Sequence, residues 1–130
     1  MTDEAEWEDY LNRFIKAYNS LPELPPIIQS VAPLLFQYQI TDQPELSYWF
    51  LIEEDKVSWG MGQYPEEGIP TVIHKTDIET MKKVNSGETD PIQATMTGIY
   101  QIEGDVTKLM ACAPLIPLSA KAHALAQEME

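Results

Sequence analysis

The stretch SYWFLIEEDKVSWGMG, residues 47–62, decides the fold of this chain. Two runs rich in apolar and aromatic residues flank an acidic pair at positions 54–55, and this pattern predicts a β-hairpin with a tight turn. We expect its strands to cover Leu46–Glu53 and Lys56–Tyr64. Because the first run is apolar at nearly every position, we expect it to be a central strand with both faces covered.

The residues before this hairpin predict two helices and a further strand. Apolar residues recur every three or four positions over 3–19, which predicts an amphipathic helix. Pro25 and Pro26 introduce a short helix over 27–32, because proline is tolerated in a first helical turn. Side chains of alternating character over Leu34–Ile40 predict the strand.

The residues after the hairpin alternate between short strands and short helices. Thr76 and Glu79 stand at capping-box spacing, which predicts a helix start, and Gly87 predicts its end. The predicted strands are Pro70–Lys75 and Ile99–Gly104, and the predicted helices are Thr76–Asn85, Pro91–Met96, Val106–Cys112 and an alanine-rich segment from Pro117 or Ser119 to the end. A meander of strands followed by one isolated strand between helices indicates an α+β fold with a mixed sheet.

The composition is that of one acidic globular domain. The chain has 130 residues, of which 44% are hydrophobic and 22% charged, so we expect a single domain over residues 1–130. Its net charge of −13 argues against nucleic acid as a partner and against electrostatic docking on anionic lipid, because both carry negative charge.

The same sequence indicates a compartment. Cys112 is the single cysteine, so no internal disulfide forms and a reducing compartment fits best. No run approaches the roughly 18 consecutive apolar residues of a membrane span. The beginning, MTDEAEWEDY, lacks the basic-then-apolar layout of a signal peptide. We expect a cytoplasmic protein without stable membrane insertion.

Three segments in order resemble the sterol carrier protein-2 family of small lipid-carrier domains. Residues 47–62 resemble the family's paired strands, in which an aromatic-rich strand turns at an acidic or glycine loop. IPTVIHKTDIETMKKVNSGETDP, residues 69–91, resembles its short strand, helix and Gly-x-x-x-Pro step. TGIYQIEGDVTKLM, residues 97–110, resembles its glycine-bounded strand that leads into a helix. The resemblance covers Ser47–Cys112, about half of the chain.

The resemblance implies a five-stranded, mixed, curved sheet with helices mainly on one face. Between sheet and helices it implies an apolar tunnel that takes a fatty acyl chain, a sterol or another lipid. It also implies that the domain has no catalytic residues, no metal and no cofactor, and that it binds and moves or presents insoluble lipids.

Candidate tunnel residues come from these segments. Methionine is unbranched and polarizable, so Met81, Met96 and Met110 either line a cavity for ligands of varied shape or fill gaps in a core. Because strand side chains alternate, we expect either Trp49 or Phe50 to face the tunnel, not both. The predicted ligand-binding residues are Trp49, Phe50, Met81, Ile92, Met96, Leu109 and Met110.

Nothing in the sequence predicts catalysis or a metal site. His74 and His123 lie in separate segments without the spacing of metal ligands. Cys112 stands between alanines with no adjacent base, so we expect a buried, inert thiol. The carboxylates at 53–55 lie in a predicted turn, where solvated charge is the simpler interpretation. We therefore expect a protein that is not an enzyme.

Two functions stay open at this stage. The first is non-catalytic binding of a lipid or another apolar small molecule, with transfer or presentation of it. The alternative is a module of the same fold that forms a homodimer or docks onto an enzyme. The tail 119–130 is either a lid over the tunnel mouth or a surface helix.

Overall fold

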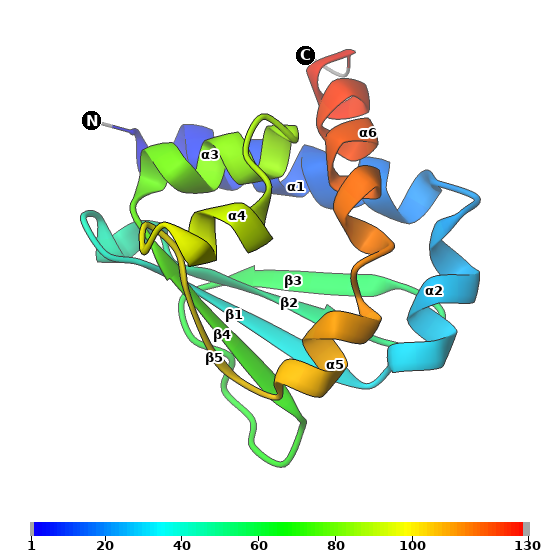
Figure 1. Cartoon of the computed structure of the whole chain (residues 1–130). Coiled ribbons are helices and arrows are strands. Elements are labelled where there is room, and N and C mark those ends of the chain that lie inside the picture. The colour runs from blue at the N-terminus through cyan, green and yellow to red at the C-terminus, as the bar shows by residue number, and fades with distance from the viewer. Residues whose placement is uncertain (1, 129–130) are drawn as a thin grey trace.

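The computed structural model describes residues 2–128, apart from the side chain of Val106 (Figure 1). Its helices are α1 (Glu4–Ser20), α2 (Leu24–Val31), α3 (Ile78–Ser86), α4 (Pro91–Met96), α5 (Val106–Ala111) and α6 (Leu115–Glu128), with one 3-10 turn, η1 (Pro44–Leu46). Its strands are β1 (Leu34–Ile40), β2 (Tyr48–Ile52), β3 (Val57–Met61), β4 (Thr71–Thr76) and β5 (Gln101–Gly104).

The five strands form one mixed sheet in the order β3-β2-β1-β4-β5. β1 and β4 are parallel, and the other neighbouring pairs are antiparallel. The predicted hairpin is confirmed, with Phe50 of β2 opposite Trp59 of β3. Phe36 also stands beside Phe50, and Tyr38 beside His74. Alternate aromatic side chains of neighbouring strands therefore gather on one face of the sheet.

The predicted position of the first hairpin strand inside the sheet is confirmed, because β2 pairs with β3 on one side and with β1 on the other. The prediction that both of its faces are fully covered is wrong, since the side chains of β2 alternate between buried and half-buried. The reason is that helices cover only one face of the sheet. β2 also begins later than predicted, at Tyr48, because the preceding residues Pro44–Leu46 form a 3-10 turn.

Short polar side chains begin most of the helices. Asp3 caps α1 by accepting a hydrogen bond from the Glu6 backbone N–H. The predicted cap of α3 is wrong by one residue: Asp77, not Thr76, accepts from the backbone of the first turn. Thr76 ends β4 instead, and its hydroxyl donates to the Ile99 carbonyl over 2.6 Å. That bond ties the strand to the segment before β5.

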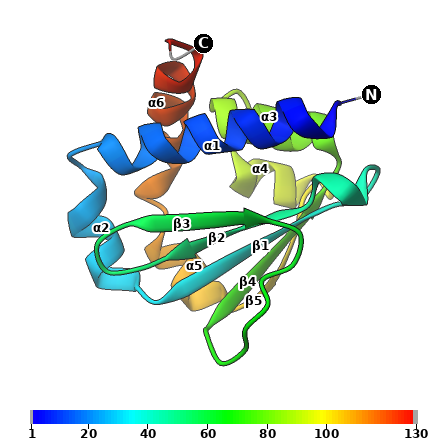
Figure 2. The same cartoon turned by 180° about the vertical axis from the view of Figure 1, so that it is seen from behind.

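The helices and the sheet enclose the core between them. Figure 1 shows α1, α3, α4 and α6 above the strands and α5 in front of them. Figure 2 shows the other face of the sheet, with no helix of the described residues over it. Fully buried side chains from helices and strands meet in this core, among them Leu11, Ile28, Leu34, Tyr48 and Val72.

The open face of the sheet is covered by an aromatic pair and a loop. The Trp49 indole lies over Gly60, where an added Cβ would come within 2.5 Å of the ring. The Tyr64 ring meets the Trp49 ring edge-on, with 4.7 Å between centroids. Buried Gln37 donates to two backbone carbonyls and accepts from the Tyr64 backbone N–H. These contacts hold the segment after β3 against the sheet.

The tail forms most of α6 and lies against α1. The helix begins two residues before Pro117, because a proline in the first turn has no N–H to lose. The Tyr10 hydroxyl and the His123 Nδ1 atom lie 2.8 Å apart, and Arg13 donates to the Ala126 carbonyl over 2.8 Å. The described part of the tail is therefore a docked helix, and its role as a lid stays a prediction.

Candidate ligand-binding pocket

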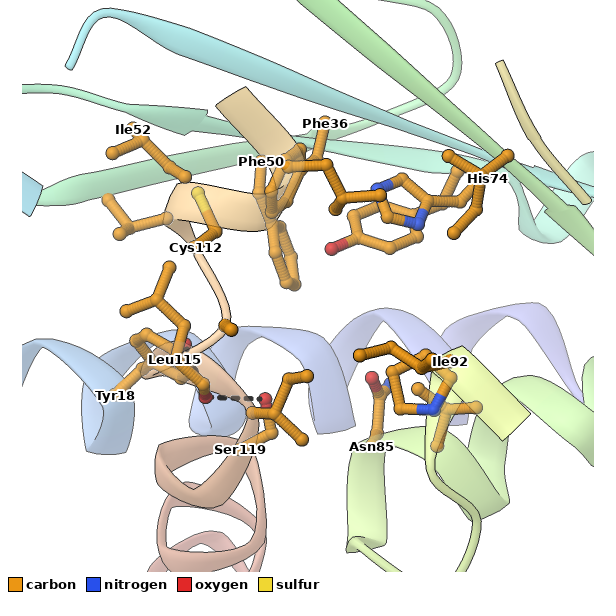
Figure 3. Close-up of a pocket in the computed structure, with 18 of the residues that line it drawn as sticks. Tyr18, Phe36, Phe50, Ile52, His74, Asn85, Ile92, Cys112, Leu115 and Ser119 are labelled. Carbon is orange, nitrogen blue, oxygen red and sulfur yellow. Dashed lines mark hydrogen bonds between the residues drawn. The ribbon is translucent and has the colours of Figure 1, made fainter. Parts of the chain in front are cut away.

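A pocket lies between the sheet and the helices (Figure 3). It holds about 950 Å³ of space free of protein atoms, counted together with its opening to solvent. Side chains from all five strands and from five of the helices line it.

The sheet supplies one wall of the pocket. Even-numbered residues of β1, β2 and β4 face it, because strand side chains alternate; they are Phe36, Tyr38, Phe50, Ile52 and His74. The rings pack closely: the Tyr38 ring stacks on His74 at 4.6 Å and meets Phe50 edge-on at 5.1 Å. This wall is aromatic and rigid.

Helices supply the opposite wall. Phe14 of α1 stacks over Phe50 of the sheet at 6.1 Å between centroids. The Tyr18 hydroxyl donates to the Leu115 carbonyl over 3.3 Å, which joins α1 to the start of α6. The hydroxyl of Ser119 bonds to the same carbonyl over 3.4 Å. The polar atoms at this end of the pocket are therefore paired with each other.

The pocket reaches the surface between α4 and α5. Ile92 of α4 and Met110 of α5 both line it, although 47% and 62% of their surfaces are exposed. We infer that these two residues form the rim of the mouth.

His74 brings a buried polar group to the sheet wall. The side chain is 5% exposed, and its Nδ1 atom lies 2.7 Å from the Tyr100 hydroxyl. Its Nε2 atom is buried and has no hydrogen-bond partner among the described residues. Burial lowers the pKa of His74 to about 3, so the imidazole is neutral at neutral pH.

Asn85 of α3 brings a second polar group from the helix wall. It is 6% exposed, and its Nδ2 atom has no hydrogen-bond partner among the described residues. Burial raises the pKa of the Tyr48 hydroxyl well above its usual value, and the Asn85 amide nearby lowers it by less. The two side chains are therefore neighbours in the core, close enough for the amide to act on the hydroxyl. Figure 3 shows Asn85 and His74 on facing walls at the same end of the pocket.

The lining of the pocket is neutral throughout. None of its side chains belongs to Asp, Glu, Lys or Arg. Cys112 lines it as a buried thiol, and burial raises the thiol pKa to about 11, so the sulfur keeps its proton. Burial likewise raises the pKa values of the Tyr18, Tyr38 and Tyr100 hydroxyls. Such a lining favours an uncharged, apolar ligand.

No arrangement for metal binding is found in residues 2–128: no three His, Cys, Asp or Glu side chains come together there. The carboxylates of the hairpin turn lie away from the pocket, and Glu53 accepts a hydrogen bond from the Ser58 hydroxyl.

The structure brings four of the predicted ligand-binding residues to the pocket. Phe50, Ile92, Leu109 and Met110 line it. Phe50 faces it and its neighbour Trp49 does not, in keeping with strand alternation. Whether these side chains contact a ligand stays a prediction.

The other three predicted residues do not line this pocket. Trp49 lies on the open face of the sheet over Gly60. Met81 is fully buried in the core, where its side chain fills space instead of bounding the pocket. Met96, at the end of α4, is 83% exposed. It points away because α4 has only six residues and presents Ala94, not Met96, to the core.

The polar residues of the pocket were not among the predicted sites. The sequence marks His74 only as a residue without the spacing of a metal ligand, and Asn85 only as the end of a predicted helix. Strand alternation could have predicted that His74 faces the core. Val72, His74 and Thr76 share one face of β4, and all three are buried. No pattern in the sequence places Asn85 opposite His74, because the two lie on different elements.

These features define the class of protein: an α+β domain with an apolar, uncharged pocket between a mixed sheet and its helices. The model of the SCP-2 sterol transfer family matches residues 11–117. The chain belongs to this family, and membership implies lipid or sterol binding or transfer. The comparison with curated proteins finds no match.

Solved structures share this fold at low sequence identity. Sterol carrier protein 2 from Yarrowia lipolytica, in its apo form, is 14% identical with a TM-score of 0.59, over 95% of this chain and 96% of that one. The SCP2 structure of the ubiquinone synthesis protein UbiJ is 16% identical with a TM-score of 0.60, over 93% of this chain and 91% of that one.

A third similar structure is part of an enzyme. The stereoselective inverting sec-alkylsulfatase from Pseudomonas sp. is 16% identical with a TM-score of 0.53, over 71% of this chain but only 14% of the sulfatase. The fold therefore occurs both alone and within a much larger protein. At such identities the likeness concerns the fold alone.

No helix among residues 2–128 is both long enough and apolar enough to cross a membrane.

Proposed function

We propose that this chain binds a lipid in the pocket between the sheet and the helices, without catalysing a reaction, and carries or presents it. The observation that carries the proposal is the pocket itself. Its walls are apolar, its polar groups are uncharged, and its rim is formed by exposed Ile92 and Met110. An apolar rim lets a lipid enter without crossing a charged surface.

The free energy available suits such a ligand. Burying a methylene gains roughly 0.8 kcal/mol. A chain with about a dozen buried carbons therefore gains about 10 kcal/mol, against an ordering cost of several kcal/mol. Micromolar binding requires a binding free energy of about −8 kcal/mol. The gain from burial reaches this value, after the ordering cost is subtracted, only for a long and well-buried chain.

Mass spectrometry of organic extracts from the purified chain tests this proposal, together with the mass of the protein in solution. We expect extracts to contain lipid in near-equal molar amount to the protein, and the delipidated protein to take it up again. Extracts without lipid, from a protein that also fails to bind added lipid, would contradict the proposal.

A second function has an observation of its own. The exposed large hydrophobic residues of the described chain all lie within 92–110: Ile92, Met96, Ile99 and Met110. Such a surface also suits docking to a second copy or to an enzyme. Met96→Glu tests this, because Met96 is exposed and does not line the pocket. A dimer that this variant dissociates, in a protein free of lipid, favours the docking module.

A further inference from the structure

We propose that the face around the pocket mouth, formed by α4, α5 and the turn after α4, docks on the surface of a neutral phospholipid bilayer. This inference rests on the proposed lipid binding and adds the place where the lipid is exchanged. Its basis is a set of large apolar side chains that are exposed and that all belong to these elements: Ile92, Met96, Ile99 and Met110. We call these four residues the mouth patch.

The mouth patch is continuous with the pocket. Ile92 and Met110 line the pocket and are also exposed, so they belong to its wall and to the outer surface. Met96 stands four residues after Ile92 in α4, and residues four apart lie on the same side of a helix. Ile99 lies in the turn that closes α4, where its backbone N–H donates to the Ala94 carbonyl over 3.2 Å. The patch therefore extends the apolar wall of the pocket onto the surface.

The two helices of the patch lie on one side of the molecule. Figure 1 shows α4 and α5 on the side nearest the viewer, and Figure 2 shows both of them behind α1 and the sheet. The side of α4 that faces inward presents Ala94, which is buried. A single flat surface can therefore touch α4 and α5 together.

The mouth patch also lies where the sequence carries little charge. The chain has 21 acidic residues and a net charge of −13, yet residues 91–102 and 106–120 contain no acidic residue, and their single charged residue is Lys108. Between these stretches, Glu103 is paired with a lysine, and Asp105 accepts a hydrogen bond from the first turn of α5. This face can therefore approach headgroups without the repulsion that the acidic remainder of the chain produces.

A bilayer suits this surface better than a protein partner does. A protein seated on the mouth patch would cover the opening through which a ligand enters. A bilayer would supply the ligand, and an apolar chain could pass between bilayer and pocket without being exposed to water. Phosphatidylcholine headgroups carry no net charge, whereas anionic headgroups repel a chain with a net charge of −13. We therefore expect docking on neutral membranes.

Flotation of the whole chain with vesicles tests the inference. We expect the unmodified protein to float with vesicles of pure phosphatidylcholine. Replacing a third of this lipid with phosphatidylglycerol should weaken binding several-fold at low salt, and added salt should restore it, because salt screens the repulsion. Tighter binding to the anionic vesicles would contradict the inference, since attraction to lysine side chains would then account for the docking.

Met96→Glu and Ile99→Glu should each lower the partition coefficient for phosphatidylcholine vesicles about tenfold or more, because a carboxylate resists transfer into the apolar part of the interface. Both residues lie outside the lining of the pocket. Binding of the apolar fluorophore diphenylhexatriene, measured without vesicles, should therefore stay unchanged in both variants.

Two control variants separate the position from the charge. Met96→Leu keeps an apolar side chain in the patch and should bind vesicles as the unmodified protein does. Ala5→Glu adds the same charge at an exposed position of α1, away from the patch, and should lower vesicle binding less than twofold. An equal loss in Ala5→Glu and Met96→Glu would show that net charge, not the mouth patch, governs docking.

An environment-sensitive fluorescent label shows which face meets the bilayer. The label is attached to a thiol introduced by Met96→Cys or by Ala5→Cys, and the native Cys112 is buried and reacts slowly. Adding phosphatidylcholine vesicles should shift the emission of the label to the blue at position 96 and leave it unchanged at position 5. The reverse pattern would place the docking surface on α1.

The outcomes separate this inference from the proposed function. If diphenylhexatriene binds but the protein does not float, or floats equally well after Met96→Glu and Ile99→Glu, docking by the mouth patch is wrong and lipid binding stands. If the patch binds vesicles but diphenylhexatriene does not bind, docking stands and the proposed function is wrong. If the protein binds neither, both are wrong. If it ignores vesicles and Met96→Glu dissociates a dimer, the patch is a protein interface and docking on a bilayer is wrong.

Discussion

The two faces of the sheet both carry aromatic residues of β2 and differ in what covers them. On the pocket face, Tyr48 is fully buried and its ring stacks on Tyr38 at 4.5 Å. On the open face, the next residue, Trp49, is half-buried over Gly60 and against Tyr64. Neighbours in one strand thus have different surroundings.

The same contrast recurs in β4. His74 faces the pocket, buried and uncharged, whereas Lys75 faces out and pairs with Glu103 over 3.3 Å. What a side chain contributes therefore depends on the layer above it more than on its type. The predictions that follow compare the two faces directly.

The largest expected difference is between Tyr48→Ala and Trp49→Ala. Removing the fully buried Tyr48 ring should lower the free energy of unfolding by about 3–5 kcal/mol, because it leaves a cavity among packed aromatic rings. Removing the Trp49 ring should lower the free energy of unfolding by only roughly 1–2 kcal/mol, because the ring is half-buried and covers less apolar area. Urea unfolding of both variants measures this, and equal losses would show that the two faces are packed alike.

The second prediction concerns pH. The pKa of His74 is lowered to about 3 in the folded protein, against an ordinary value of 6.5. Between these values the unfolded chain binds a proton that the folded chain does not, so stability falls as pH falls. We expect the His74 contribution to raise the unfolding equilibrium constant about tenfold per pH unit below 6.5.

His74→Phe removes this contribution. Urea unfolding of both proteins at several pH values should show that the variant loses less stability than the unmodified protein as the pH is lowered from 6.5. All other side chains are the same in the two proteins, so their contributions cancel in the comparison. Parallel pH profiles would mean that His74 is accessible to protons in the fold.

The third prediction compares two residues of α4. Ile92→Trp should weaken binding of an apolar fluorophore about tenfold, because Ile92 lines the pocket at its mouth and a larger ring narrows it. Met96→Trp should leave binding and thermal stability unchanged, because Met96 is 83% exposed and outside the pocket. Fluorescence titration measures both, and a selective loss in Met96→Trp would place the mouth elsewhere.

The smallest effect is expected on the open face. Lys75→Ala breaks the ion pair with Glu103, whose side chain is 56% exposed. An exposed ion pair is weakened by solvent and salt, so the variant should lower the free energy of unfolding by less than about 1 kcal/mol. Thermal unfolding at low and high salt checks this, and a large loss at low salt would reveal a stronger interaction at this edge.

Local patterns in the sequence determined the secondary structure and much of the topology. The hairpin, the mixed sheet and the short helices follow from alternation, helical spacing and turn residues. Asp90 and Asp105 stand directly before α4 and α5, and both side chains accept from the first turn of their helices, as short polar residues at such positions commonly do. Each of these signals acts over a few residues, so it can be read without knowing the rest of the fold.

The tertiary structure alone decided which strand lies in the middle of the sheet, which methionines line the pocket and which polar groups face it. Three methionines that the sequence does not distinguish lie in different surroundings. Met81 is buried in the core, Met96 is exposed at the surface, and Met110 lies at the rim of the pocket. His74 and Asn85 face each other only because α3 folds back over β4. Such placements depend on how distant elements pack, and the spacing of residues along one helix or strand carries no information about the layer that covers it.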